Sequence, residues 1–392
     1  MFFTATAGRA PASELRSFAE NLASSDLGVA TADVVPGAWE AALTLVTAVR
    51  PYVVVIDEFP FLVRGSPEVE GAVQNVWDRV LSRHPVLLVL IGSDVAVMEG
   101  LTADERPLYG RPTRVLRVDP LSAEVAELLG EPAADALDDY LVVGGFPELV
   151  RSRADAPDLE HFLTAQLSYA TSPLLVAGER GVTAQFPPET PRGRVLRAIG
   201  SDASAFGRIS DRSGVPRPTL QRTLDTLVDA RVIAREVPLA VPRGRHRRYR
   251  IADPALRFWL RYLDRGLADV ERGRGDLVLA RIQRDWPDQR GRAIEPIVRH
   301  ALLRLLPDDR LGNVAEIGSW WTRAHDIEVD IVGVDDADRP RRVTAVGTIR
   351  WRDRRPLSRD DVAELHARRV QVPGADDPTT TTAPASSTVS CT

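Results

Sequence analysis

The stretch "PYVVVIDEFPFLV", residues 51–63, decides how the first part of this chain folds. It contains a run of apolar residues, Tyr52 to Ile56, followed at once by two adjacent acids, Asp57 and Glu58. A short apolar run rich in β-branched residues predicts a strand that is buried on both faces of a parallel sheet. Ligands bind α/β sheets in the crevice beyond the carboxyl ends of the strands, so the two acids stand where a ligand site is expected.

Adjacent acids at the end of a central strand suit phosphoryl transfer assisted by a metal ion. This chemistry needs one acid that holds Mg²⁺, usually through water, and one that orients the attacking water. We assign the metal position to Asp57 and the base to Glu58. The alternative is that acids follow a buried strand merely because the chain emerges into water there.

The residues around this strand repeat the same alternation of strands and helices. Residues 1–8 and 85–92 are predicted to be further strands, with helical segments between them. Such alternation predicts an α/β core over residues 1–119, with a parallel sheet covered on both faces. Ser93 follows the strand at 85–92 and is expected to contact the γ-phosphate or the attacking water. Arg111 is expected to approach the phosphates, either in its own chain or from a neighbouring subunit of a homo-oligomer.

Composition is typical of a soluble cytoplasmic protein. The chain has 392 residues, of which 44% are hydrophobic and 27% charged, and this length is enough for several domains. The apolar run at 85–92 is too short to span a membrane, and the N-terminus lacks the basic region of a signal peptide. The one cysteine, Cys391, excludes an intramolecular disulfide framework. All 50 basic residues are arginine, so no lysine is available for a phosphate-binding loop, a Schiff base or a nuclease site.

Composition also divides the rest of the chain into four segments. Residues 120–186 are helical and acidic and are expected to form a lid, and the prolines at 185–191 mark its end. Residues 187–268 are basic, and residues 277–370 form a last α/β unit. The tail at 371–392 is rich in threonine, serine and proline and is predicted to be disordered.

The basic segment has the periodicity of a winged helix-turn-helix. Apolar stripes at 195–199 and 220–228 flank a short helix that ends at Gly214, where a tight turn needs a left-handed residue. Residues 192–265 contain 17 arginines and 7 acidic residues, a balance that suits contact with DNA phosphates. The side chains predicted to contact DNA are Arg217, Gln221 and Arg222 on the third helix, and Arg243, Arg245, Arg247 and Arg248 in the wing. The alternative is a protein-interaction module whose arginines pair with the acidic residues at 124–160.

The last α/β unit carries acids in the order found in metal-dependent nucleases. A helix at 290–306 carries Glu295, and a later strand carries Asp330. The unit resembles the PD-(D/E)xK nuclease fold, in which a helix acid, a strand aspartate and a Glu-x-Lys pair gather around one metal ion. Thr348 and Arg350 stand at the Glu-x-Lys position, where a hydroxyl replaces the anionic ligand and arginine cannot act as a base. We therefore expect a degenerate nuclease-like domain that serves in binding or docking.

Several blocks of the sequence resemble one known family. "VVVIDEFPFL", "LIGSDVAVM", "PLYGRPTRVLRVDPLS" and "YLVVGGFPELV" are similar, in this order, to the predicted prokaryotic ATPases of the archaeal AAA+ type. The resemblance implies a P-loop NTPase fold with a helical lid, a winged helix and a C-terminal nuclease-like domain of unknown function. It also implies ATP and Mg²⁺ as cofactors and DNA as a partner. In that family "FFTATAG" is the strand after the phosphate-binding helix, so the glycine-rich loop with its Lys-Thr is expected upstream of Met1.

The interpretation that unites these features is an ATPase relative that couples its nucleotide state to the binding of DNA or a partner through the winged helix. Two other classes stay open. One is a non-enzymatic DNA-binding regulator whose N-terminal region is only a scaffold, and the other is an active metal-dependent nuclease.

We predict that the 392-residue chain neither binds ATP at micromolar concentration nor hydrolyses it robustly. Its sequence supplies no glycine-rich loop ending in Lys-Ser or Lys-Thr, whose N–H groups and ammonium would bind the β-phosphate. A titration of the purified chain with ATP in the presence of Mg²⁺ measures this affinity. Micromolar binding would contradict the prediction.

Overall fold

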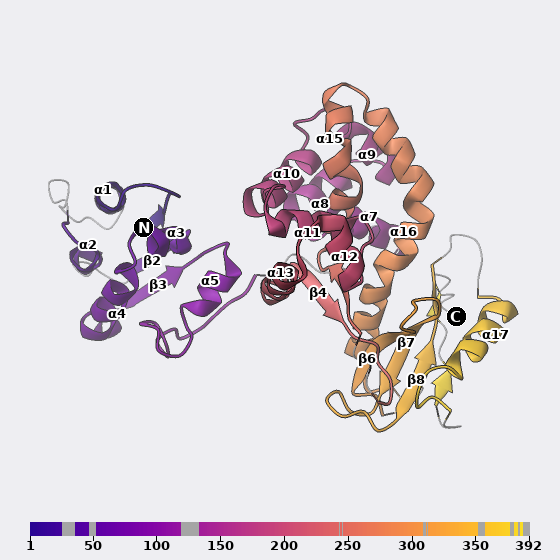
Figure 1. Ribbon diagram of the computed structural model, residues 1–392. Coiled ribbons are helices and arrows are strands. Elements are labelled where there is room, and N and C mark those ends of the chain that lie inside the picture. The colour runs from indigo at the N-terminus through magenta and orange to yellow at the C-terminus, as the bar shows by residue number, and fades with distance from the viewer. Residues whose placement is uncertain are drawn as a thin grey trace. The chain divides into compact units, whose positions relative to one another are not determined.

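The computed structural model divides the chain into two compact units, residues 1–118 and residues 119–392, each of which is considered by itself (Figure 1). The residues that it describes are 1–25, 36–46, 52–118, 133–242, 244, 246–308, 311, 313–351, 357–376, 380–382 and 385–386. Arg243 and Arg245, two of the arginines predicted to contact DNA, lie outside these ranges. None of the described helices is long and apolar enough to cross a membrane.

The N-terminal unit is built on a three-stranded parallel sheet with the strand order β1-β2-β3. Its strands are β1 Phe2–Thr4, β2 Tyr52–Asp57 and β3 Val86–Leu90. Thr4 pairs with Asp57 and Ile56 with Leu90, so the three carboxyl ends lie at one edge. The helices of this unit are α1 Pro11–Ala23, α2 Trp39–Leu45, α3 Phe59–Gly65, α4 Val69–Arg79, a short 3-10 turn Leu81–Arg83, and α5 Val95–Gly100. The parallel α/β architecture expected from the sequence is confirmed, as a small sheet.

The described helices cover only one face of this sheet. Val54 and Ile56 are buried in the core of the unit, whereas Phe2, Val53 and Leu87 on the other face keep 58%, 49% and 55% of their surface exposed. The expectation that both faces are covered is therefore wrong for the described part of this unit. Along the chain, each new strand is placed on the same side of the previous one, in the order β1-β2-β3. Because crossovers between parallel strands are right-handed, this order puts every connecting helix on the same face of the sheet.

In the second unit the acidic helical segment and the helix-turn-helix share one hydrophobic core. The segment forms α7 Ala133–Val143, α8 Pro147–Ala154, α9 Leu159–Gln166 and α10 Pro173–Gln185. Phe162 belongs to the same buried cluster as Leu196 and Leu224 of the next segment. A Cβ atom on Gly178 of α10 would lie 1.8 Å from Cδ1 of Trp259, so this helix approaches its neighbour as closely as a glycine permits. The predicted boundary between lid and winged helix thus falls inside one core.

The basic segment folds as the helix-turn-helix that its periodicity predicts. It consists of α11 Pro191–Gly200, α12 Phe206–Ser213, α13 Arg217–Asp229 and an antiparallel hairpin of β4 Ile233–Glu236 with β5 Arg248–Ile251. Gly214 ends α12 in the left-handed conformation, with φ 63°, which the turn into α13 requires. Its apolar stripes are buried, namely Val195, Leu196, Ile199, Leu220, Leu224 and Leu227.

A single long helix joins this domain to the C-terminal sheet. It is preceded by α14 Pro254–Phe258, a π-helical turn Trp259–Leu263 and α15 Asp264–Glu271. The long helix, α16, runs for 30 residues from Gly275 to Arg304 with Pro287 and Pro296 inside it. The helix predicted at 290–306 is therefore only its second half, and α16 follows α15 after a turn at Gly273, which has φ +74°.

The C-terminal sheet has the strand order β10-β8-β7-β6, and β6, β7 and β8 are antiparallel. Its strands are β6 Glu316–Trp321, β7 Glu328–Val334, β8 Val343–Gly347 and β10 Thr381–Thr382. The same part of the chain holds α17 Arg359–Arg369 and a second, two-stranded sheet of β9 Ile349–Arg350 and β11 Ala385–Ser386. The prediction of a disordered tail is wrong for residues 381–382 and 385–386, because β10 pairs with β8 and β11 with β9. Thr380 also donates a 2.8 Å hydrogen bond from Oγ1 to the carbonyl of Val343, and threonine suits strands.

Candidate functional site

The structure brings Asp57, Glu58 and Ser93 together at the carboxyl edge of the N-terminal sheet, which we call the acid edge. Asp57 ends β2, and its Oδ1 accepts a 3.0 Å hydrogen bond from the backbone N–H of Glu58. The hydroxyl of Ser93 lies 3.1 Å from each carboxylate oxygen of Glu58. Glu58 has the left-handed conformation, with φ 53°, which is strained for a residue other than glycine and recurs at functional sites.

Thr4 is a member of the acid edge that the sequence interpretation missed. Its register partner on β2 is Asp57, and its Oγ1 donates a 3.4 Å hydrogen bond to Oδ2 of that residue. The sequence signal that could have identified Thr4 is its place as a polar residue toward the carboxyl end of the first predicted strand. Thr4 therefore adds a hydroxyl on the strand that neighbours β2.

Arg111 does not contact the described acid edge. Its Nε and Nη2 bind the two carboxylate oxygens of Asp78 on α4 at 3.0 and 2.8 Å, and its Nη1 donates to the carbonyls of Pro107 and Tyr109. Hydrogen bonding from this guanidinium lowers the pKa of Asp78. The fork of Arg111 is thus held by Asp78 on α4 and by carbonyls of its own turn, and an approach to phosphates would require its release. That role remains a prediction.

The acid edge fits a magnesium ion only in the company of a phosphate. Asp57 and Glu58 supply two carboxylates, and Thr4 and Ser93 supply hydroxyl oxygens. Within the described ranges no group of three or more acidic, histidine or cysteine side chains is arranged to hold a metal ion. Mg²⁺ is commonly bound by one or two carboxylates together with substrate phosphates. The residues present match that pattern.

The face of α13 that a DNA groove would meet is open at its N-terminal half. Arg217, Thr219 and Arg222 are exposed. Gln221 is different, because its amide donates a 2.9 Å hydrogen bond to Asp225, whose carboxylate also pairs with Arg235 of β4. Of the predicted contacts on this helix, the two arginines are therefore directly available.

The two wing arginines that the structure describes, Arg247 and Arg248, do not form one basic surface. Arg247 is exposed, but Arg248 on β5 keeps only 14% of its side chain accessible. Its guanidinium lies 4.3 Å above the ring of Trp321 and binds Glu328 at 2.8 Å. A cation stacked on an indole and paired with a carboxylate has its charge satisfied within the protein. Contact of Arg248 with DNA would require it to leave these partners, and that role stays a prediction, since charge patterning alone does not reveal which partner an arginine takes.

We call the part of the second unit that holds β6 to β11 and α17 the C-terminal unit. Three of the predicted nuclease-site residues meet there at one oxygen. Oδ2 of Asp330 accepts hydrogen bonds from Oγ1 of Thr348 at 2.8 Å, the N–H of Ile349 at 2.8 Å and Nη1 of Arg350 at 3.2 Å. Two further acids bind the same guanidinium, Asp361 at 3.3 Å and Glu364 at 3.2 Å. Arg350 thus supplies the positive charge around which these carboxylates gather.

Glu295, the fourth predicted residue, joins this centre through Arg299. Arg299 lies 3.5 Å from the carboxylate of Glu295 and donates a 3.0 Å hydrogen bond to the backbone carbonyl of Asp330. Burial and, next, the charge of Asp330 raise the pKa of Glu295 to about 8. A carboxyl group that is protonated at neutral pH is a poor ligand for a divalent cation. The arrangement therefore favours a centre built on internal arginines over one built on a metal ion.

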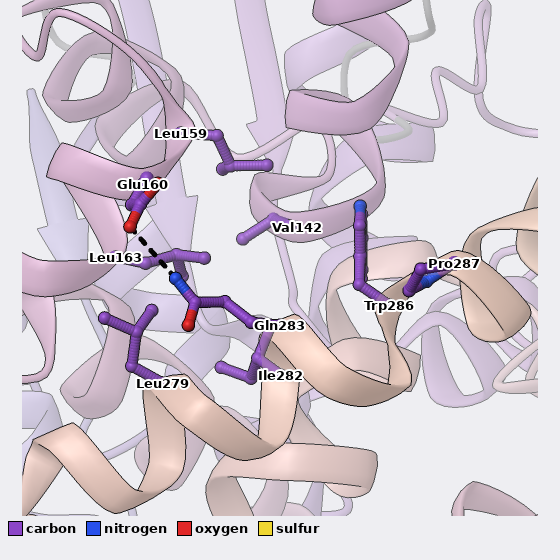
Figure 2. Close-up of a pocket in the computed structure, with 9 residues that line it drawn as sticks. All are labelled: Val142, Leu159, Glu160, Leu163, Leu279, Ile282, Gln283, Trp286 and Pro287. Carbon is purple, nitrogen blue, oxygen red and sulfur yellow. Dashed lines mark hydrogen bonds between the residues drawn. The ribbon is translucent and has the colours of Figure 1, made fainter. Parts of the chain in front are cut away.

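A groove on the helical part of the second unit offers apolar contact and little chemistry (Figure 2). It has a volume of about 260 Å³ and lies between α7, α9 and α16. The residues that line it are Val142, Leu159, Glu160, Leu163, Leu279, Ile282, Gln283, Trp286 and Pro287. Figure 2 shows that the side chains of Glu160 and Gln283 point toward each other, and a 2.9 Å hydrogen bond joins them.

Comparison with known proteins identifies two segments of the chain. Residues 193–236 match the IclR helix-turn-helix domain, which confirms the domain seen in α11 to α13. Residues 259–365 match a family described as archaeal and bacterial proteins of unknown function. An uncharacterised protein of Methanocaldococcus jannaschii is 25% identical over 358 residues, which cover 86% of this chain and 76% of the relative.

Two solved structures are distantly similar to the chain. A Walker-type ATPase of Pyrococcus abyssi matches with 23% identity and a TM-score of 0.41, over 53% of this chain and 63%, less than two thirds, of that one. The Orc1 protein of Aeropyrum pernix, in complex with DNA, matches with 18% identity and a TM-score of 0.33, over 72% of this chain and 78% of that one.

Substitution of Arg350 by methionine is expected to destabilise the C-terminal unit by about 3 kcal/mol, because three carboxylates then lose their shared cation. Urea unfolding of the full chain measures the change. Arg323→Met, in an exposed turn of the same unit, is the matched control and should change stability little.

Two outcomes would contradict this account of the centre. One is a stability of Arg350→Met equal to that of the control. The other is cleavage of plasmid DNA by the wild-type chain with Mg²⁺ or Mn²⁺, abolished by Asp330→Ala, which would show that the centre works as a metal-dependent nuclease.

The raised pKa of Glu295 predicts a loss of stability as the pH rises from about 4.5 towards about 8. In this window the unfolded chain has released the proton and the folded chain still holds it, so the folded state binds more protons and weakens with increasing pH. Glu295→Gln, a permanently neutral mimic, should flatten this dependence and be more stable than the wild type above pH 8. Unfolding midpoints across the pH range, with Glu271→Gln at an exposed site as control, measure it. Parallel curves for wild type and Glu295→Gln would refute the assignment.

Proposed function

We propose that this protein binds duplex DNA through its helix-turn-helix and carries a nucleotide-responsive site of the AAA+ type at the acid edge. The observation that carries the proposal is the open N-terminal half of α13, where Arg217, Thr219 and Arg222 are exposed. Recognition helices of helix-turn-helix domains contact base edges with residues of their N-terminal part. Arginine is well suited to this task because it binds guanine through two hydrogen bonds and phosphates through its charge.

Charge supports DNA over a protein partner. Residues 192–265 contain 17 arginines and 7 acidic residues, in a chain whose net charge is −5. Several of these arginines are paired within the domain, among them Arg197 with Asp264 and Arg250 with Glu236. Arg217 and Arg222 remain exposed, five positions apart on α13, where they add to the attraction of phosphates.

The nucleotide part of the proposal rests on Thr4, Asp57, Glu58 and Ser93 at the acid edge. ATP and Mg²⁺ are the proposed cofactors, with Asp57 holding the metal through water and Glu58 orienting the attacking water. A nucleotide bound there would bias the N-terminal unit toward one state and thereby alter DNA binding. Because the sequence contains no lysine, we expect this chain to bind ATP weakly, so that ATP has only a small effect on DNA binding.

A non-enzymatic DNA-binding regulator is the second candidate. The observation that favours it is the engagement of Arg111 with Asp78 of α4, which keeps that guanidinium occupied within the N-terminal unit. Electrophoretic mobility shifts with and without ATP distinguish the two functions. DNA binding that ATP does not alter would favour the regulator.

Replacement of both Arg217 and Arg222 by alanine is expected to weaken binding to a short mixed-sequence duplex by about 10- to 100-fold, because the binding free energy of two contacts is lost. Fluorescence anisotropy of a labelled duplex measures the affinity and its salt dependence. Arg272→Ala, which removes an exposed arginine beyond α15, is the control and should bind like the wild type. An unchanged affinity of the double variant would rule out α13 as the DNA-contacting helix.

A further inference from the structure

The segment that connects β4 to β5 comprises residues 237–247, and its described residues 237–242, 244 and 246–247 lead away from the helix-turn-helix to the C-terminal sheet. We call this segment the arm. In Figure 1, β4 runs toward the sheet that holds β6, β7 and β8. The N–H of Leu239 donates a 2.9 Å hydrogen bond to the carbonyl of Ser319, and the N–H of Val241 donates one of 2.9 Å to that of Pro373. The described part of the arm is thus hydrogen-bonded to β6 and to the segment after α17.

Apolar side chains of the arm belong to the core of the C-terminal sheet. Leu239 and Ala240 are 1% and 2% exposed and lie in the same buried cluster as Val332 and Val346. A Cβ atom on Gly318 of β6 would lie 3.3 Å from the Cβ of Leu239. The strand therefore has a glycine where Leu239 of the arm packs on it. Removal of the arm would expose this core.

The chain returns from the arm through a second set of contacts. Nε2 of His246 lies 3.1 Å from the carbonyl oxygen of Trp321. Nε of Arg248 donates a 2.8 Å hydrogen bond to Nδ1 of His325, and Nη1 donates one of 2.8 Å to Glu328. His246 and Arg248 therefore face β6, β7 and the turn between these strands.

We propose that the arm keeps this position when DNA is bound. The DNA interface is then centred on α12 and α13, and the arm is a rigid connection that holds the C-terminal unit at a fixed place beside the duplex. This inference rests on the proposed DNA binding. Release of the arm would leave the carbonyls of Ser319 and Pro373 without these hydrogen bonds and would expose Leu239 and Ala240, so retention is favoured.

A disulfide that locks the arm tests the inference. Leu239→Cys and Gly318→Cys, combined with Cys391→Ser to remove the native cysteine, place two Cβ atoms within a few tenths of an ångström of ordinary disulfide geometry. The oxidised chain should bind a mixed-sequence duplex with the affinity and salt dependence of the same chain after reduction. Oxidised protein that binds more than about 10-fold more weakly, or with a shallower salt dependence, would show that the arm must leave for DNA to bind.

Formation of the disulfide is itself informative. If the arm is docked, mild oxidation without DNA should link residues 239 and 318 quantitatively, as measured by mass spectrometry of peptides. Incomplete linkage in a folded chain would overturn docking whether or not the protein binds DNA. If linkage is complete and neither form binds DNA, the proposed function fails and the docked arm stands.

A milder variant covers the case in which the cysteine pair prevents folding. Arg248→Ala should leave the salt dependence of DNA binding unchanged, because the side chain faces Trp321 and Glu328. Arg222→Ala, in contrast, should lower the slope by about 1, as expected for the loss of one phosphate contact. A similar decrease with Arg248→Ala would overturn the inference.

Discussion

The second unit depends on the contacts of the Arg299 guanidinium to hold its parts together. Arg299 is 8% exposed on α16, lies 3.5 Å from Glu295 and 3.6 Å from Glu236 of β4, and donates to the carbonyl of Asp330 on β7. One cation therefore joins the winged helix, the long helix and the C-terminal sheet. Removing one partner from such a buried group leaves an uncompensated charge, which costs several kcal/mol. The network makes the helix-turn-helix and the C-terminal sheet parts of one body.

Arginine takes the positions where lysine or a metal ion would serve in other proteins. Its planar fork binds several carboxylates at once, and its charge is not lost on burial. Arg350 joins Asp330, Asp361 and Glu364, and the buried Arg153 binds Asp139 at 2.7 Å. A centre assembled in this way has its anionic groups neutralised by fixed side chains. Its chemistry is that of a structural junction.

Features set by local periodicity were predictable from the sequence. The strand at Tyr52–Asp57 and the helices around Gly214 follow from apolar spacing and turn chemistry, and the position of Asp57 and Glu58 follows from the end of the strand. The contacts of the arm and of Arg299 were not predictable. They join residues such as Leu239 and Ser319, which are far apart in sequence, and an arginine-rich hairpin has the same composition whether it faces DNA or a tryptophan.

The exposed face of the N-terminal sheet illustrates the same limit. Apolar residues on both sides of β2 predict burial on both faces, yet Val53 is 49% exposed while Val54 is 1% exposed. The direction in which strands are added decides the side on which helices lie, and that direction depends on pairings between distant segments.

The central claim is that DNA contacts α12 and α13 while the arm stays on the C-terminal sheet. Hydrogen exchange of the full chain with and without a short mixed-sequence duplex tests it most directly. The account predicts slower exchange in α12 and α13 upon addition of DNA and no change in the arm, β6 or β7. Slower exchange in the arm, or none in α13, would contradict it.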